Sequence, residues 1–244
     1  MSESTSDPSA SPDADDANAN AGEADRLPRR DRIPRPTVRR LSLYLRELEG
    51  SMDGNGTVSS RQLATALGLT DAQVRKDLAY FGQFGQPGIG YRHEELANAL
   101  RRILGTDRPR ATAVVGAGNL GRAVTCYGRL DGKGFNVVEV FDLDDAVVGT
   151  TVGGLVVRPM SELAIAVETS DIEIAMLAVP GDAADDVARQ LVEAGVRGIL
   201  NFAPVRLPVP DGVAVVSVDL TVALEQLAYK MALGIEGDEQ HAAD

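Results

Sequence analysis

The chain has 244 residues, of which 44% are hydrophobic and 25% charged, with one cysteine and two histidines. This length suggests one or two domains, and the apolar fraction is too high for a disordered chain. A single cysteine excludes an internal disulfide, and no cluster of Cys and His suits a zinc site. No apolar run reaches the roughly 18 residues of a membrane helix, and the N-terminus lacks a signal-peptide pattern. These features predict a cytoplasmic protein.

The net charge of −12 conceals an uneven distribution of charge along the chain. Residues 1–25 carry seven acidic and no basic residues, whereas residues 26–110 carry 16 Lys and Arg against nine Asp and Glu. Residues 111–244 are again acidic, with eight basic residues against 20 acidic ones. A basic segment in an acidic chain points to a polyanionic partner such as nucleic acid, although a solvated basic face would have the same composition.

Residues 1–32 are predicted to be a disordered acidic tail and a basic, proline-broken arm. Their few apolar side chains could not offset the entropy lost on ordering. A helix is then predicted from Thr37 to Gly50, because its apolar residues recur at the spacing of one helix face. These residues are Val38, Leu41, Leu45 and Leu48.

Two short helices are predicted next, each opened by a sequence typical of a capping box. Ser59 begins the first, which ends at Leu67, and Thr70 begins the second, which ends at about Phe81. Gly68 separates them. Two short capped helices joined in this way predict a helix-turn-helix.

The second of these helices has the pattern of a recognition helix. Val74 and Leu78 share the face expected to pack on the core, together with Phe81. Long polar side chains near the start of the helix can then point outward and reach base edges in the major groove of DNA. These side chains belong to Gln73, Arg75 and Lys76.

Residues 82–91 contain four glycines and a proline near aromatic residues. This composition suits a tight β-ribbon, or wing, whose glycine backbone can approach phosphate, although an ordinary surface hairpin would have it too. Residues 33–92 are therefore predicted to form a winged-helix DNA-binding domain that contacts double-stranded DNA. The candidate contacts are Ser60, Gln73, Arg75, Lys76, Tyr80, Gly88 and Gly90.

Residues 93–109 are predicted to be a connecting helix and linker, and residues 110–218 a Rossmann-type domain with a doubly wound parallel sheet. A buried strand at 112–115 leads directly into a glycine-rich turn, and a helix to about Arg129 follows. The turn consists of Gly116, Ala117, Gly118, Asn119, Leu120 and Gly121.

The strand at 136–141 ends at Asp142, roughly 20 residues after Gly121, which is the placement of the acid that binds an adenine ribose. The glycine turn and the helix N-terminus would hold the pyrophosphate of the cofactor. An acid at this position repels a 2′-phosphate, which favours NADH/NAD+ over NADP(H). A Rossmann fold that binds another nucleotide or coenzyme A is the alternative.

Strands and helices continue to alternate after Asp142, with strands at 155–157, 172–179, 198–202 and 213–218. Ligands of such folds lie outside the carboxyl ends of the strands. Several residues at these ends are candidate walls of the cofactor pocket, although loop packing would account for each of them equally well. They are Val179, Pro180, Asn201, Phe202 and Ala203.

The last helix is predicted over residues 219–234, with Asp219 as its N-cap and Gly234 after its end. The helix has almost no polar face, so it must be buried. Insertion into a second subunit would bury it, and packing within its own chain is the alternative. Residues 235–244 are predicted to be a disordered tail.

A Rossmann domain usually indicates a dehydrogenase, but the only histidines are His93 and His241, and neither is placed to protonate a substrate. No substrate domain follows the last strand. A sensor therefore fits the sequence better than an NAD-dependent oxidoreductase with a DNA-binding appendage, which is the alternative.

Four motifs in order resemble the Rex family of redox-sensing transcriptional repressors. They are the QVRKDLAYFG run at 73–82, the GIGY that ends the wing at 88–91, the glycine-rich turn and the NFAP at 201–204. The similarity covers about Ile33 to Gly234. It implies a homodimer with a domain-swapped C-terminal helix that binds a palindromic operator at low NADH and leaves it when NADH binds.

The resemblance also implies a switch. In the family, an Arg on the first helix pairs with the Asp that starts the partner's swapped helix, and a Tyr after the glycine-rich turn takes part. The matching residues are Arg46, Asp219 and Tyr127. Some members have Phe after that Asp, whereas this chain has Leu220.

Overall fold

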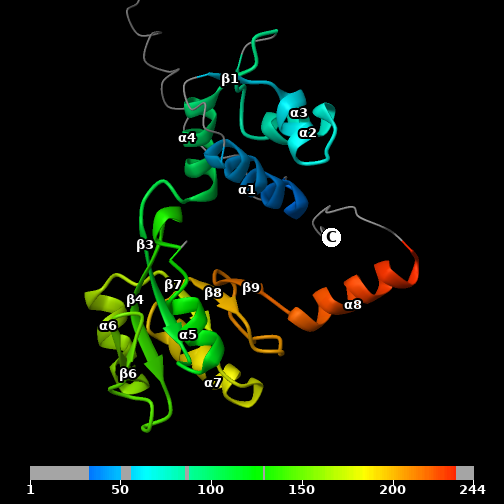
Figure 1. The fold of residues 1–244 in the computed structure, drawn as a ribbon. Coiled ribbons are helices and arrows are strands. Elements are labelled where there is room, and N and C mark those ends of the chain that lie inside the picture. Colours follow the sequence, from blue (N-terminus) through cyan, green and yellow to red (C-terminus); the bar gives the residue numbers. More distant parts are fainter. Residues whose placement is uncertain (1–32, 51–55, 86–87, 129, 235–244) are drawn as a thin grey trace, which may run out of the picture.

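The computed structural model describes residues 33–50, 56–85, 88–128 and 130–234 (Figure 1). The two predicted disordered tails, at 1–32 and 235–244, lie outside these residues. The described chain forms an N-terminal helical region, a seven-stranded sheet with helices on both faces, and a C-terminal helix. The chain is therefore α/β.

The N-terminal region contains four helices and a short antiparallel ribbon. Helix α1 packs on α4, and α2 packs on α3. Leu41, Tyr44 and Leu48 of α1 are fully buried, together with Leu96 and Leu100 of α4, so the predicted connecting helix contributes to this core. The elements are α1 (Arg35–Gly50), β1 (Thr57–Val58), α2 (Ser60–Ala66), α3 (Asp71–Ala79), β2 (Tyr91–Arg92) and α4 (His93–Leu104).

The buried face of α1 differs from the predicted one at its start. Val38 is 44% exposed, whereas Thr37 is buried. The reason is tertiary, because the Thr37 hydroxyl donates a hydrogen bond to the buried Asp77 of α3. Leu41, Leu45 and Leu48 are buried as predicted.

The predicted wing has different strand pairing from the one expected. Tyr91 pairs with Val58, upstream of α2, instead of pairing across the glycine-rich turn. Gly90 has a φ of +94°, and a Cβ there would lie 2.7 Å from the Val58 carbonyl oxygen. A glycine is therefore required where this segment approaches β1.

The sheet has the strand order β5-β6-β4-β3-β7-β8-β9, and every neighbouring pair is parallel except β5 with β6. Chain order reverses between β3 and β7, as it does in a Rossmann fold. The unpredicted β5 is only two residues long. The strands are β3 (Arg110–Val115), β4 (Phe135–Asp142), β5 (Thr151–Val152), β6 (Leu155–Pro159), β7 (Ile174–Leu177), β8 (Gly198–Asn201) and β9 (Ala214–Ser217).

The two faces of the sheet bury different helices. Val115 clusters with side chains of α6 (Leu163–Thr169) and α7 (Gly181–Glu193), whereas its neighbour Val114 clusters with Val124 of α5 (Asn119–Thr125). Alternation along β3 thus covers both faces. Two 3₁₀ turns complete the domain, η2 (Asp131–Lys133) and η3 (Met160–Glu162).

Helix α5 is shorter than predicted. It ends at Thr125 instead of continuing to about Arg129. The β-branched Val124 and Thr125 have low helix propensity, and Gly128 follows them, so nothing local sustains another turn.

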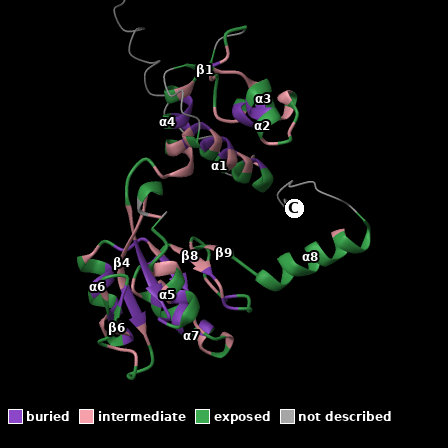
Figure 2. Cartoon of the chain, viewed as in Figure 1, coloured by how far each residue is buried: buried purple, intermediate pink, exposed green. Residues whose placement is uncertain are grey.

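Helix α8 (Leu220–Ala232) extends away from the sheet and has no buried residue (Figures 1 and 2). Asp219 caps it as predicted, because its carboxylate accepts hydrogen bonds from the backbone amides of Thr221 and Val222. Gly234 follows the helix with a φ of +63°. A helix that is well capped and strongly apolar is therefore left in solvent by its own chain.

Candidate DNA-binding face and nucleotide site

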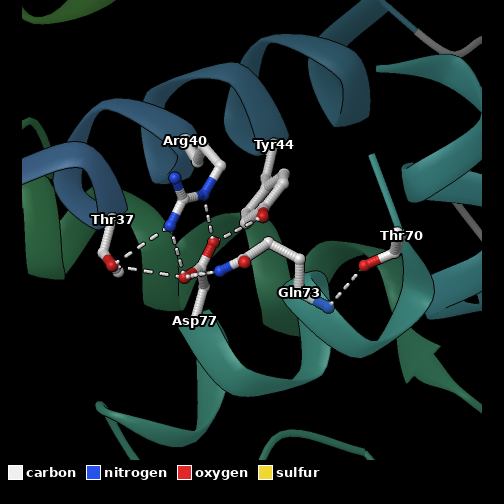
Figure 3. Close-up of polar contacts among 6 residues, drawn as sticks. All are labelled: Thr37, Arg40, Tyr44, Thr70, Gln73 and Asp77. Atoms are coloured by element: carbon white, nitrogen blue, oxygen red, sulfur yellow. Dashed lines mark hydrogen bonds and ion pairs between the residues drawn. The ribbon is translucent and has the colours of Figure 1, made fainter. Parts of the chain in front are cut away.

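The buried carboxylate of Asp77 joins α3 to α1 (Figure 3). Arg40 donates to it from Nε at 2.6 Å and from Nη2 at 2.8 Å. The Tyr44 hydroxyl donates at 2.8 Å and the Thr37 hydroxyl at 3.2 Å. The Gln73 amide adds a fourth donor residue at 2.9 Å. We call these five residues the Asp77 cluster.

The charge of Asp77 is stabilised by these donors. Burial alone would raise the pKa of the Asp77 carboxyl, but hydrogen bonds from Arg40, Tyr44 and Gln73 outweigh it and hold the pKa below its ordinary value. Burial raises the pKa of the Tyr44 hydroxyl, and its hydrogen bond to Asp77 raises it further. The carboxylate and the neutral phenol therefore persist at neutral pH, and the cluster fixes α3 on α1.

Sequence reasoning missed the Asp77 cluster, although a signal was present. Asp77 lies three residues after Val74 and one before Leu78, so it falls on the core face of its helix. A buried carboxylate requires charged or hydrogen-bonding partners. The basic and hydroxyl side chains of α1 are candidates for such partners.

Gln73 is placed differently from the predicted outward orientation. Its side chain turns back to Asp77, so only half of the second capping box forms. The Thr70 hydroxyl still accepts from the Gln73 backbone amide at 3.2 Å. The first capping box is complete, because Ser59 and Gln62 bond reciprocally.

Arg75 and Lys76 are exposed on α3, as the sequence predicts. A groove of about 540 Å³ runs beside Arg75, and it brings together three candidate DNA contacts, Ser60, Gly88 and Gly90. Tyr80 is the C-cap of α3 and is partly buried. A groove that is lined by an arginine and by a glycine-rich segment can accept a sugar-phosphate backbone.

The glycine-rich turn after β3 closes only because Gly116 and Gly121 have no side chains. A Cβ at Gly116, whose φ is +98°, would lie 2.4 Å from the Ala178 carbonyl oxygen. A Cβ at Gly121 would lie 1.7 Å from the Gly116 carbonyl oxygen. The turn therefore packs tightly against the end of β7, beside Val179.

Asp142 lies at the end of β4 and holds this turn. One carboxylate oxygen accepts from the Ala117 amide at 2.6 Å, and the other accepts from the Asp144 amide at 3.0 Å. Each oxygen keeps a further acceptor position that ribose hydroxyls could use. Both the bare glycine backbone and this acid fit an adenine dinucleotide that lacks a 2′-phosphate.

Not all of the residues predicted to line the cofactor pocket are exposed to a ligand. Asn201 is fully buried, and its amide donates to the Val205 carbonyl oxygen at 2.8 Å and to the Ser217 hydroxyl at 3.3 Å. The side-chain oxygen of Asn201 accepts a hydrogen bond from the Ala203 backbone amide at 2.9 Å. Asn201 and the buried Ala203 thus shape the loop after β8, whereas Phe202 is partly exposed and Pro180 is exposed.

The three predicted switch residues are exposed and lie on different elements. Arg46 is on α1, Tyr127 follows α5, and Asp219 caps α8. Within the described part of the chain, no hydrogen bond or ion pair joins any two of them. Among the described residues, no helix could span a membrane, and no cluster of Cys, His, Asp or Glu side chains is suited to hold a metal ion.

Two family models match the chain, one in each region. A putative DNA-binding protein N-terminus matches residues 32–79, and a CoA binding domain matches residues 107–205.

Full-length relatives decide the family. The redox-sensing transcriptional repressor Rex of Carboxydothermus hydrogenoformans is 48% identical over 201 residues, which cover 82% of this chain and 97% of the relative. The repressor of the same name from Syntrophobacter fumaroxidans is 42% identical over 205 residues, covering 83% of this chain and 98% of the relative. The chain belongs to the Rex family.

Crystal structures of a Rex-family repressor, RSP, share the fold. RSP in complex with β-NAD+ and operator DNA aligns with a TM-score of 0.78 and 36% identity, over 83% of this chain and 94% of RSP. RSP in complex with β-NADH aligns with a TM-score of 0.74 and 34% identity, over 83% of this chain and 95% of RSP. The Rex similarity therefore spans both the helical region and the sheet.

Proposed function

We propose that this chain is a DNA-binding transcriptional repressor that senses the ratio of NADH to NAD+. One observation carries the proposal, namely that a repressor crystallised with operator DNA and NAD+, and also with NADH, aligns over 83% of this chain. The chain binds a palindromic operator when NADH is scarce and leaves it when NADH binds. It acts in the cytoplasm and has no enzymatic activity, in keeping with relatives that are named repressors.

Operator contacts are assigned to the α3 face and the groove beside it. Arg75 and Lys76 reach into the major groove, while the backbone at Gly88 and Gly90 approaches phosphate. Gln73 instead helps to fix α3 on α1, because its side-chain amide donates a hydrogen bond to Asp77. Ser60 and Tyr80 flank the same surface.

The cofactor site is assigned to the turn at 116–121 and to Asp142. The bare glycine backbone admits the pyrophosphate, and Asp142 accepts hydrogen bonds from the adenine ribose. The residues after β7 and β8, Val179–Pro180 and Phe202, line the nicotinamide end. When bound, the cofactor supplies the redox signal, since its reduced ring lacks the positive charge of the oxidised ring.

The exposed helix α8 makes the protein a homodimer in this proposal. Its apolar side chains are buried against a second copy of the chain. Asp219 of one chain then approaches Arg46 and Tyr127 of the other. The dimer is proposed to have one conformation that binds DNA and one that does not. Release of DNA requires NADH to bind the second conformation more tightly, because equal affinity for both would leave their populations unchanged.

Fluorescence anisotropy of a labelled palindromic operator tests the function. NADH is titrated at fixed salt against an excess of NAD+, with NADPH and coenzyme A titrated in parallel. We expect NADH alone to release the operator and NAD+ to oppose the release. Release by coenzyme A and not by NADH would instead favour the ligand named in the matching family model.

Two variants separate the two sites. Arg75→Ala weakens operator binding by roughly tenfold, as expected for a lost base contact, and leaves NADH affinity unchanged. Asp142→Ala weakens NADH binding by roughly tenfold, as expected for lost hydrogen bonds to a charged group, and leaves operator binding intact. Loss of both activities in either variant would contradict the assignment.

A further inference from the structure

Arg75 is held by two acceptors on the DNA-facing surface. Its Nη1 donates to the Asp71 carboxylate at 2.6 Å and to the Ser60 hydroxyl at 3.3 Å. Within the described part of the chain, Nε and Nη2 of Arg75 have no hydrogen-bond partner. The guanidinium is therefore fixed at one corner, and its remaining donors are free for a ligand.

Asp71 is an unexpected residue on this surface, because a carboxylate repels DNA phosphate. It lies in the first turn of α3, one turn before Arg75, and its side chain is 41% exposed. The hydrogen bond from Arg75 holds the pKa of the Asp71 carboxyl below its ordinary value, and the charge of Arg61 on α2 adds to this effect. Asp71 therefore stays charged where DNA is expected to bind.

A negative charge here has two consequences for DNA binding. It offsets part of the attraction between the basic face and any phosphate backbone, which lowers non-specific affinity. It also restrains the Arg75 fork, and specific reading of guanine requires two donors of that fork in a fixed orientation. The first consequence lowers the affinity for every duplex, the operator included, whereas the second favours only the operator and so increases the difference in affinity between the operator and other DNA.

We propose that Asp71 is a specificity-determining residue, which orients Arg75 toward a guanine and suppresses binding to unrelated DNA. The inference rests on the proposed function, since it requires α3 to bind DNA. Asp71 itself acts through Arg75 and is a positioning residue.

The test begins with an operator that the full-length wild-type protein selects from a pool of random duplexes. Dissociation constants are then measured, without NADH, for this operator, for versions with each guanine replaced by adenine, and for a scrambled duplex. The variant is Asp71→Asn. The matched control is Asp186→Asn, which removes the same charge from an exposed helical pair with Arg189 on α7, far along the chain from α3.

We expect Asp71→Asn to bind the scrambled duplex more tightly and to lower the operator-to-scrambled affinity ratio by about tenfold, the size of one base discrimination. The loss of discrimination is confined to one guanine of the operator, and replacing that guanine by adenine no longer weakens binding of the variant. Arg75→Ala removes the same discrimination, and adding Asp71→Asn to it causes no further loss of the ratio.

A ratio that changes no more than in Asp186→Asn would overturn the inference, as would a change spread evenly over all base positions. The latter pattern is what a general loss of helix stability produces. If the wild-type protein selects no sequence from the pool, the proposed function itself is wrong, and the inference fails with it.

Discussion

Helices α1 and α8 are both well formed, but only α1 is completed by its own chain. Helix α1 buries Leu41, Tyr44 and Leu48 in the core of the N-terminal region. Helix α8 buries none of its residues, and Leu224 and Met231 are 64% and 72% exposed. Capping and helix propensity therefore form a helix without deciding what covers it.

The difference separates local from non-local causes. Asp219 satisfies the first amides of α8 within a few residues, whereas its apolar face needs a surface from elsewhere. An exposed apolar helix of this kind marks an interaction site. We infer that α1 belongs to the fold of one chain and α8 to the assembly of two.

The largest expected effect comes from a charge on α8. Leu224→Asp should destabilise the dimer by about 3 kcal/mol, or roughly a hundredfold in its dissociation constant, because a buried leucine is lost and a carboxylate is desolvated. Sedimentation velocity over a range of concentrations measures the change, with Glu225→Gln on the same helix as the control. A dimer unaffected by Leu224→Asp would contradict the inference that α8, unlike α1, is buried in the assembly of two chains.

A smaller effect is expected where α1 meets α3. Asp77→Asn should lower the free energy of unfolding by about 2 kcal/mol at pH 7, because Arg40 loses a buried charged partner. The pKa of Asp77 is lower in the folded chain than its ordinary value. Its contribution is therefore present above about pH 4, the ordinary value, and is lost as the pH falls through the folded value.

Urea denaturation of Asp77→Asn at neutral and acidic pH, at one chain concentration, checks this sign. The variant should lose less stability than the wild type on acidification. Tyr44→Phe is the control, because it removes one hydrogen bond and retains the titrating carboxylate. A wild type and Asp77→Asn with parallel pH profiles would exclude Asp77 as the source.

The smallest effect is expected at the end of α1. Glu49 is paired with Arg101 of α4 at 2.9 Å and with Lys133 of η2, so it links the helical region to the sheet domain. Burial alone would raise the pKa of Glu49, but hydrogen bonds from Lys133 and Arg101 outweigh this effect, hold the pKa below its ordinary value and leave the carboxylate charged. Glu49→Gln should cost at most about 1 kcal/mol, as for other partly exposed ion pairs.

Salt dependence identifies the Glu49 contribution as electrostatic. The difference in unfolding free energy between wild type and Glu49→Gln should shrink from low salt to about 1 M, where charges are screened within a few ångströms. A difference that persists unchanged at high salt would assign Glu49 a packing role instead.

The sequence predicted those features that local patterns specify. Ser59 and Asp219 cap helices as expected, and the spacing from Gly121 to Asp142 placed the acid beside the glycine turn. The strands of the sheet other than β5 were predicted, because a short apolar run typical of a buried strand is also a local pattern. What the pattern could not give was contact between distant segments.

Three errors show why. Val38 was assigned to the core because its spacing fits, but the rotation of α1 is set by Arg40 reaching Asp77. The partner of Tyr91 is Val58, which the turn at 82–91 does not reveal. The inward turn of Gln73 depends on the same buried carboxylate.

The central claim is that two chains joined through α8 bind one operator and leave it when NADH binds. Native mass spectrometry of the full-length protein with a palindromic duplex measures this directly, first in NAD+ and then after addition of NADH. We predict two chains per duplex in NAD+, and in NADH free duplex together with a protein that is still a dimer. One chain per duplex, or a complex that NADH leaves intact, would contradict the account.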